Sequence, residues 1–296
     1  MGNKVIVKLL HSLLLVVLLF PGSIAQTSSQ SAEVRQIGRS TAGHPIEVYH
    51  FGNGPRRVIF VGGIHGGYER NTVELAWQLI EYFNAHPALV PKLITLEIVP
   101  VANPDGLVRI VGSMARSAVN KPLAGVDPYA GRFNSNQVDL NRNWSCDWQA
   151  VANGPRGEVS AGSAPMSEKE TRALADFFAQ PEVAGVVFWH SAANGVYAGG
   201  CGGEYSPASA LASLYAQASG YPHQAAFSAY PITGDVTNWL AARGIPAITI
   251  ELRQQEDPEY EQNLRGVQAL LRFFSQPITH CHSKRVSLFY AKSASC

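Results

Sequence analysis

The sequence predicts an α/β protein, a three-layer α/β/α sandwich whose twisted sheet is mixed and mostly parallel. Strand-like and helix-like runs alternate along the chain, and this alternation is typical of layered α/β domains. Four strand-like runs are apolar over nearly their whole length, as strands covered by helices on both faces are. With 296 residues, 46% of them hydrophobic and 15% charged, the chain can bury a sizeable core and is not a disordered protein.

The four strand-like runs have chemically useful residues near their carboxyl ends. In chain order the runs are 57–61, 93–101, 186–189 and 247–250. Three of them lead to His65, His190 and Glu251, each able to bind a metal or move a proton. The remaining run leads into Asn-Pro-Asp-Gly at 103–106, a strong turn signal. Since ligands of open α/β sheets bind beyond the carboxyl ends of the strands, we expect the site there.

Helical periodicity predicts the elements that separate these strands. Apolar residues recur at three- and four-residue spacing across 73–83 and across 260–274. A Ser-x-x-Glu pattern at 167–170 predicts a capping box at the start of a third helix. A fourth helix is expected over 206–220, from a Ser-Pro start to a glycine stop.

The start of the chain has the features of a secretory signal peptide. Residues 1–25 combine two lysines, an apolar stretch at 9–20 and small residues before Gln26. The stretch is shorter than the roughly 20 residues of a membrane-spanning helix, so we expect cleavage rather than an uncleaved anchor. The expected mature protein is secreted or periplasmic, without membrane association.

The domain organisation follows from the same patterns. We expect a flexible segment at 26–36, one catalytic domain at 37–277 and a tail at 278–296. The 23 basic and 22 acidic residues give a net charge of +1, which argues against nucleic acid as a partner. The sequence indicates no oligomeric state.

Export makes disulfide bonds possible. The four cysteines are Cys146, Cys201, Cys281 and Cys296. They allow three pairings, of which we expect Cys146–Cys201 with Cys281–Cys296. They contain no Cys-x-x-Cys pair, which argues against a thiolate zinc site.

The segment His-Gly-Gly-Tyr-Glu at 65–69 carries two candidate metal ligands. His65 and Glu69 can share one zinc ion, and His190 from another strand would complete a His₂Glu site with a fourth position for water. Taken alone, the segment also fits a glycine turn with a surface glutamate.

A second cluster, Val-Asp-Leu-Asn-Arg-Asn-Trp at 138–144, suits carboxylate binding. Arg142 can hold a carboxylate in a bidentate pair, and Asn141 can add a hydrogen bond. Asp139 can accept the free ring N–H of a zinc-bound histidine. Taken alone, this cluster also fits a polar loop with an Arg–Asp pair.

In combination, these motifs resemble the zinc carboxypeptidases related to carboxypeptidase A. The similarity extends over roughly 37–274, with the motifs in order and at fitting distances. They are the His/Glu pair, Asn-Pro-Asp-Gly at 103–106, the 139–144 segment, His190-Ser191, Tyr230 before Trp239, and Thr-Ile-Glu-Leu-Arg at 249–253.

The resemblance implies a single Zn2+ and a set of catalytic roles. The implied zinc ligands are His65, Glu69 and His190. Glu251 would be the general base for a zinc-activated water. An arginine would polarise the scissile carbonyl; we favour Arg132 over Arg116 for this role.

The resemblance also implies how substrate binds. Asn141 and Arg142 would bind the free C-terminal carboxylate of a peptide, and Tyr230 would close over the bound residue. Asp235 either favours an amine-bearing side chain or caps a helix, and we favour the cap. The expected activity is therefore that of a C-terminal peptidase. The alternatives are a murein peptide amidase, which cleaves γ-D-glutamyl-diaminopimelate, and a non-catalytic peptide-binding relative.

The chain departs from the family pattern at one ligand. The usual spacing is His-x-x-Glu, whereas three residues separate His65 from Glu69. We expect the glycine-containing turn at 66–68 to absorb the additional residue. Glu74, the other candidate, lies more than a helical turn further on.

Overall fold

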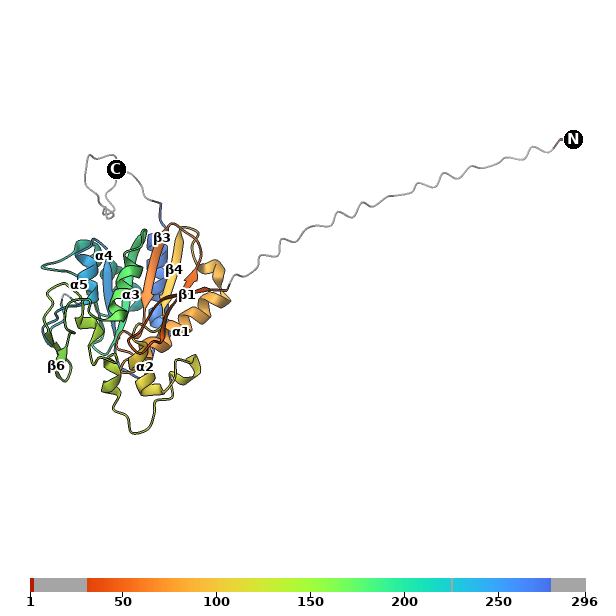
Figure 1. Cartoon of the computed structure of the whole chain (residues 1–296). Coiled ribbons are helices and arrows are strands. Elements are labelled where there is room, and N and C mark those ends of the chain that lie inside the picture. Colours follow the sequence, from red (N-terminus) through yellow and green to blue (C-terminus); the bar gives the residue numbers. More distant parts are fainter. Residues whose placement is uncertain (3–30, 225, 278–296) are drawn as a thin grey trace, which may run out of the picture.

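The computed structural model describes residues 1–2, 31–224 and 226–277 (Figure 1). The predicted signal peptide, apart from its first two residues, lies outside these ranges. The predicted tail at 278–296 also lies outside them, and with it the Cys281–Cys296 pairing. Within the described ranges, none of the helices combines the length and apolar content needed to cross a membrane.

Among the described residues, seven strands form one mixed sheet in the order β1-β2-β4-β3-β7-β9-β8, which confirms the predicted fold class. The four central strands, β4, β3, β7 and β9, run parallel. The outer strands join antiparallel. The bounds are β1 Glu33–Arg39, β2 Pro45–Phe51, β3 Arg56–Val61, β4 Ile94–Val99, β7 Val183–Ser191, β8 Gly195–Ala198 and β9 Ala247–Leu252, with a separate hairpin of β5 Val151–Gly154 and β6 Gly157–Ser160.

Helices cover both faces of this sheet (Figure 1). The α-helices are α1 Arg70–Ala85, α2 Pro104–Val111, α3 Lys169–Phe178, α4 Ser206–Ser219, α5 Val236–Ala241 and α6 Tyr260–Phe274. Short 3-10 helices are η1 Pro87–Leu89, η2 Arg116–Ala118, η3 Pro128–Arg132 and η4 Leu140–Arg142. The helices α1, α4 and α6 pack on one face of the sheet, and α3 and α5 pack on the other.

The apolar strands are buried from both sides because successive side chains point to opposite faces. In β3, Val58 and Phe60 belong to the core under α1, α4 and α6. Ile59 and Val61 belong to the core under α3 and α5. All four are completely buried, which explains why the run lacks the polar alternation of a half-exposed strand.

The four strands and four helices predicted from periodicity are present, with ends shifted by a few residues. The predicted capping box of α3 is wrong, since the N-cap residue is Glu168 and no side chain caps the helix. Ser167 donates its hydroxyl proton to Glu168, and Glu170 accepts the backbone N–H of Thr41. Tertiary partners therefore replace the local hydrogen bonds that the pattern predicts.

Two further expectations need correction. Asn103 does not begin a simple turn: its side chain accepts the N–H of Gly106 and caps α2. The expected flexible segment at 26–36 overlaps β1, in which Glu33 is paired with His50 of β2. Backbone pairing with a neighbouring strand explains why residues 33–36 are extended despite their polar composition.

Candidate metal centre

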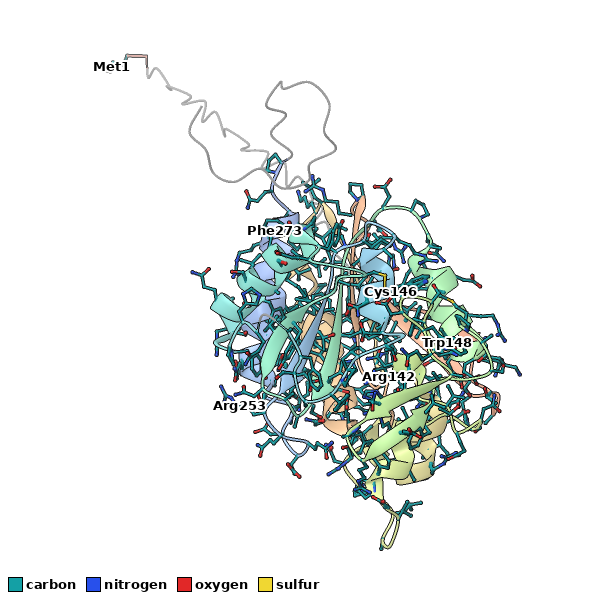
Figure 2. The ribbon with its side chains drawn as sticks, turned by 90° about the vertical axis from the view of Figure 1, so that its left-hand side faces the viewer. Met1, Arg142, Cys146, Trp148, Arg253 and Phe273 are labelled. Atoms are coloured by element: carbon teal, nitrogen blue, oxygen red, sulfur yellow. A yellow bond between two sulfur atoms is a disulfide. The ribbon has the colours of Figure 1, made fainter. Side chains whose placement is uncertain are left out.

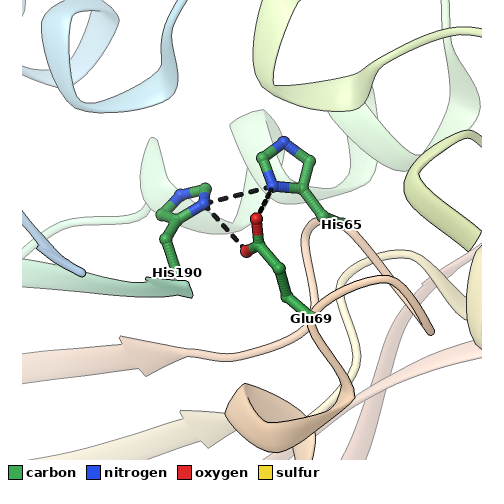
Figure 3. Close-up of side chains that lie close together, drawn as sticks. All are labelled: His65, Glu69 and His190. Carbon is green, nitrogen blue, oxygen red and sulfur yellow. Dashed lines mark hydrogen bonds and ion pairs between the residues drawn. The ribbon is translucent and has the colours of Figure 1, made fainter. Parts of the chain in front are cut away.

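Three buried side chains from two neighbouring strand ends meet at the carboxyl edge of the sheet. His65 and Glu69 come from the loop between β3 and α1, and His190 lies near the end of β7. The Nδ1 atom of His65 lies 2.7 Å from Glu69 Oε1, and the Nδ1 atom of His190 lies 3.2 Å from Glu69 Oε2. The two Nδ1 atoms are themselves 3.2 Å apart (Figure 3).

The additional residue between His65 and Glu69 is taken up by a turn. The N–H of Tyr68 donates to the carbonyl of His65, and α1 begins only after Glu69. Gly66 has a φ of +48°, and a Cβ there would lie 2.7 Å from the backbone of Gly106 and Gly131. A glycine is therefore required where this loop packs against its neighbours.

Asp139 orients the first histidine. Its carboxylate is fully buried, with Oδ1 3.3 Å from Nε2 of His65. A proton on Nε2 is favoured by this carboxylate, which leaves the lone pair of Nδ1 directed at Glu69 and His190. Asp139 also pairs with Arg132, whose Nη2 lies 2.7 Å from Oδ2.

The geometry of this cluster fits a zinc ion. Two nitrogen lone pairs at this separation repel each other unless a proton or a cation lies between them. Two imidazoles and a carboxylate are a common zinc ligand set, and ligands about 2.0–2.1 Å from a tetrahedral ion lie about 3.3 Å from each other. The observed separations of 2.7, 3.2 and 3.2 Å are close to that value. His65, Glu69 and His190 would therefore hold the ion.

The surroundings of the cluster shift the pKa values of Glu69 and Glu251 in opposite directions. Burial disfavours ionisation of Glu69, but His65 and His190 outweigh it and hold the pKa of this carboxyl below its usual value. Burial raises the pKa of Glu251 to about 7, against the opposing effect of His190. The backbone pairing places His190 and Glu251 opposite each other on β7 and β9. The pKa of Glu69 is thus lowered and that of Glu251 is raised, a separation that is common among the acidic groups of functional sites.

The two arginine candidates lie in different places. Arg132 is 2% exposed, and its Nη1 lies 3.3 Å from Nδ1 of His65 and 3.8 Å from Glu69 Oε1. Arg116 instead binds the carboxylates of Glu74 and Glu81 on α1. The structure thus brings Arg132 to the cluster and leaves Arg116 elsewhere. Glu74, the alternative ligand, is likewise occupied by Arg116.

A cavity of about 1120 Å³ opens beside the cluster and is lined by the predicted substrate-binding residues Asn141, Arg142 and Tyr230, together with Glu251. Arg142 donates from Nε to the carbonyl of Asn153 and from Nη1 to that of Asn141. Within the described part of the chain its Nη2 has no hydrogen-bond partner, so this group is available to an anion. The guanidinium carbon lies 5.8 Å from the centre of the Tyr230 ring.

The predicted disulfide between Cys146 and Cys201 is formed (Figure 2). Cys146 follows η4, which carries Asn141 and Arg142, while Cys201 lies beside the cavity-lining glycines 199–200. The bond therefore connects two walls of the cavity that are distant in sequence.

Sequence reasoning missed a hydrogen-bonded support behind the site. The hydroxyl of Ser191, next to His190, donates to the side chain of Asn71 in α1. Asn71 in turn donates to the carbonyls of Gln254 and Asp257, beyond the end of β9. The only sequence signal was the position of Ser191 beside a candidate ligand, because nothing local links Asn71 to residues more than 180 positions away.

Asp235 caps α5, as favoured from the sequence: its Oδ1 accepts the N–H groups of Thr237 and Asn238. Its side chain also lines the cavity.

The sequence also places the chain among known proteins. Residues 20–268 match the zinc carboxypeptidase family, peptidase M14. The chain belongs to that family. Membership of this family implies Zn2+ as the cofactor.

Similar proteins within this zinc carboxypeptidase family differ in their named activities. A gamma-D-glutamyl-L-diamino acid endopeptidase 1 from Lysinibacillus sphaericus is 25% identical over 79% of this chain and 63% of its own length. A metallocarboxypeptidase A-like protein from Trichophyton verrucosum is 28% identical over 82% of this chain and 65% of its own length. This chain thus spans slightly less than two thirds of either relative.

A solved structure shares the fold of this family member. Bovine thrombin-activatable fibrinolysis inhibitor, in complex with tick carboxypeptidase inhibitor, aligns with a TM-score of 0.61 and 21% identity. The alignment covers 83% of this chain and 88% of that chain.

Proposed function

We propose that this protein is a secreted zinc carboxypeptidase that removes C-terminal residues from peptides with a free carboxylate. The observation that carries the proposal is the shared cavity: Arg142 and Asn141 line the same space as the His65, Glu69 and His190 cluster. A carboxylate-binding arginine beside a hydrolytic metal site selects the bond next to a chain end. Export rests on the predicted signal peptide.

Glu251 is the proton carrier of the proposed reaction. Bound zinc supplies the Lewis acidity that activates a water nucleophile. Glu251 accepts the proton of the attacking water and passes it to the leaving amine. Its raised pKa, about 7, suits both steps near neutral pH.

Arg132, held in place by Asp139, stabilises the negative charge that develops during the reaction. Arg132 is held by Asp139 with its guanidinium beside His65, where it stabilises the oxygen of the scissile carbonyl as charge develops. Because Asp139 fixes the guanidinium in advance, little reorganisation is needed during the reaction.

Asn141, Arg142 and Tyr230 position the substrate. The free Nη2 group of Arg142 and the amide of Asn141 bind the terminal carboxylate, and Tyr230 covers the bound residue. Holding that carboxylate places the last peptide bond at the metal centre, so that binding of the chain end also orients the bond to be cleaved.

A second candidate is a murein peptide amidase acting on the γ-D-glutamyl-diaminopimelate bond. The relative from Lysinibacillus sphaericus favours it, since its named activity concerns a γ-D-glutamyl-diamino acid bond. The released diamino acid would present a carboxylate to Arg142 as an ordinary C-terminal residue does.

One mass-spectrometric digest tests these proposals. The zinc-loaded protein is incubated with free-acid peptides, their C-terminal amides and the murein tripeptide L-Ala-γ-D-Glu-diaminopimelate. Stepwise loss of residues from the free acids alone is the expected result. Release of diaminopimelate with the other peptides intact would assign murein turnover instead. No cleavage of any substrate would favour a non-catalytic binding protein.

The variant Arg142→Ala tests whether Arg142 recognises the terminal carboxylate of the substrate. Because hydrogen bonds to a charged group contribute about 1.5–3 kcal/mol, we expect kcat/KM on free acids to fall by about 10–100-fold. Turnover of amides, already poor, should change little. An unchanged preference for free acids would contradict the proposed role of Arg142.

A further inference from the structure

Asp235 places a negative charge in the wall of the cavity where we propose that the substrate carboxylate binds. The residue is only 7% exposed. Its Oδ1 accepts from the N–H of Thr237 at 2.8 Å, the hydroxyl of Thr237 at 2.6 Å and the N–H of Asn238 at 3.0 Å. These bonds stabilise the charge and fix the carboxylate at the start of α5.

The second oxygen of Asp235 contacts a substrate-binding residue. The Nδ2 group of Asn141 donates to Asp235 Oδ2 at 3.0 Å. At the other end of the same amide, Oδ1 of Asn141 accepts the N–H of Val236 at 3.1 Å. One acceptor and one donor therefore define which end of the Asn141 amide is nitrogen.

This orientation matters for an anion-binding site. An amide nitrogen carries two N–H groups, and Asp235 takes one of them, which leaves the other for a ligand. If the amide of Asn141 were flipped, its oxygen would face Asp235 and its nitrogen would face the N–H of Val236. Oxygen would then face oxygen at one end and N–H would face N–H at the other, so neither hydrogen bond could form.

We propose that Asp235 is a positioning residue for Asn141, an inference that rests on the proposed function. It holds the Asn141 amide so that nitrogen, and not oxygen, meets the C-terminal carboxylate of the substrate. Asp235 acts through Asn141 and does not itself contact the substrate.

Because Asp235 is acidic, a positioning role and a purely electrostatic role predict different effects of its removal. If charge alone mattered, removing an anion near the carboxylate site would tighten the binding of free-acid peptides. If Asp235 instead bound an amine of the released residue, only peptides ending in a basic or diamino residue would suffer from its removal. Positioning predicts an equal loss for all free acids, whatever the side chain.

The test uses Asp235→Asn and Asp235→Ser in the full-length, zinc-loaded protein. Asparagine keeps the size but offers Asn141 an amide that can pair in either orientation. Serine keeps the N-cap of α5 but is too short to hold Asn141. Asp127→Asn, which alters an exposed N-cap on η3, is the control, and thermal unfolding checks that each variant folds.

For both Asp235 variants we expect a KM about tenfold higher, with kcat nearly unchanged, because loss of a held donor weakens ground-state and transition-state binding alike. Ac-Ala-Ala-Leu and Ac-Ala-Ala-Lys should be affected equally, and their amides should not be affected. An unchanged or lowered KM for the free acids, or a loss confined to the lysine peptide, would overturn the inference.

A binding measurement separates this inference from the proposed function. Calorimetry of Ac-Ala-Ala-Leu with Glu251→Gln, alone and combined with Asp235→Asn, measures recognition without turnover. A tenfold weaker Kd in the double variant supports the positioning role even if the wild-type protein hydrolyses none of the peptides. Equal Kd values, or no binding to Glu251→Gln at all, would overturn it.

Discussion

Glu69, buried between two imidazole rings, would be costly in the fold without a cation. A buried carboxylate is stable only when it is paired and hydrogen-bonded, and here His65 and His190 are its neighbours. The three side chains thus form a site whose polar groups are best satisfied by a shared metal ion. This arrangement also explains how a glutamate one position beyond the usual family spacing reaches both histidines.

Replacing two buried glutamates, Glu69 and Glu74, tests the assignment of Glu69 as a zinc ligand. We expect Glu69→Gln to weaken zinc affinity by more than about 100-fold, since even residues behind the ligands are worth 10–100-fold. Glu74→Gln, which disrupts the pair with Arg116, should leave zinc affinity unchanged. Competition with a chromogenic chelator measures both. Stronger loss of zinc in Glu74→Gln would contradict the assignment of Glu69.

In the proposed mechanism, Glu251 carries the proton. Glu251→Gln keeps the shape of the side chain but cannot accept a proton, so we expect kcat to fall by about 10²–10⁴-fold. Zinc content, measured by atomic emission, should stay at one ion per chain because Glu251 is not among the proposed ligands. Turnover equal to that of the wild type would rule out Glu251 as the base.

At the scale of elements, short helices and loops position the site, and their ends are fixed by side-chain contacts between distant segments. Asp105 in the first turn of α2 accepts the N–H groups of Ala42 and Ser135. Burial opposes the ionisation of Asp105, but bonds from Ser40, Ser135 and Ala42 outweigh it and lower its pKa. Through Asp105, the segment at 103–106 is therefore hydrogen-bonded to the loops that contain Ala42 and Ser135.

The lowered pKa of Asp105 predicts the pH dependence of its contribution. A carboxyl whose pKa is lower in the folded protein stabilises the fold above its unfolded pKa, about 3.9, and loses this effect as pH falls through the folded pKa. We expect Asp105→Asn to lower the free energy of unfolding by about 1–3 kcal/mol at pH 7. The difference from wild type should shrink towards pH 3.

Urea unfolding at the two pH values makes this comparison. Asp127→Asn, at an exposed N-cap, serves as the control and should have the smaller effect. A difference that grows on acidification would contradict the assigned direction of the Asp105 shift.

At the scale of the whole molecule, the cavity is assembled from segments that only the fold brings together. The Cys146–Cys201 bond closes a sequence separation of 55 residues between two of its walls. The bond restricts the unfolded chain, so its loss should matter for stability as well as for the site.

We expect Cys146→Ser combined with Cys201→Ser to lower the free energy of unfolding by about 2–4 kcal/mol. A reductant should destabilise the wild-type protein in urea titrations and have little further effect on the double variant. If the reductant destabilised both proteins equally, the stabilisation would come from another bond.

The sequence was most informative where the signal is local or periodic. Continuous apolar runs predicted the central strands, because burial on both faces leaves no room for polar alternation, as in Val58 to Val61. Recurring apolar positions predicted α1 and α6 for the same reason. Edge strands such as β1 escaped prediction, since their exposed, polar residues are ordered mainly by pairing with a neighbour.

By itself, the sequence determined the fold class, the family and the candidate residues, because these depend on composition, periodicity and motif spacing. Tertiary structure decided that Arg132 rather than Arg116 lies at the cluster, and that Glu69 reaches both histidines despite its spacing. It also decided that Asp235 holds Asn141, a contact across 94 positions. Such choices depend on distances between segments far apart in the chain, which are fixed only when the sheet and its loops pack together.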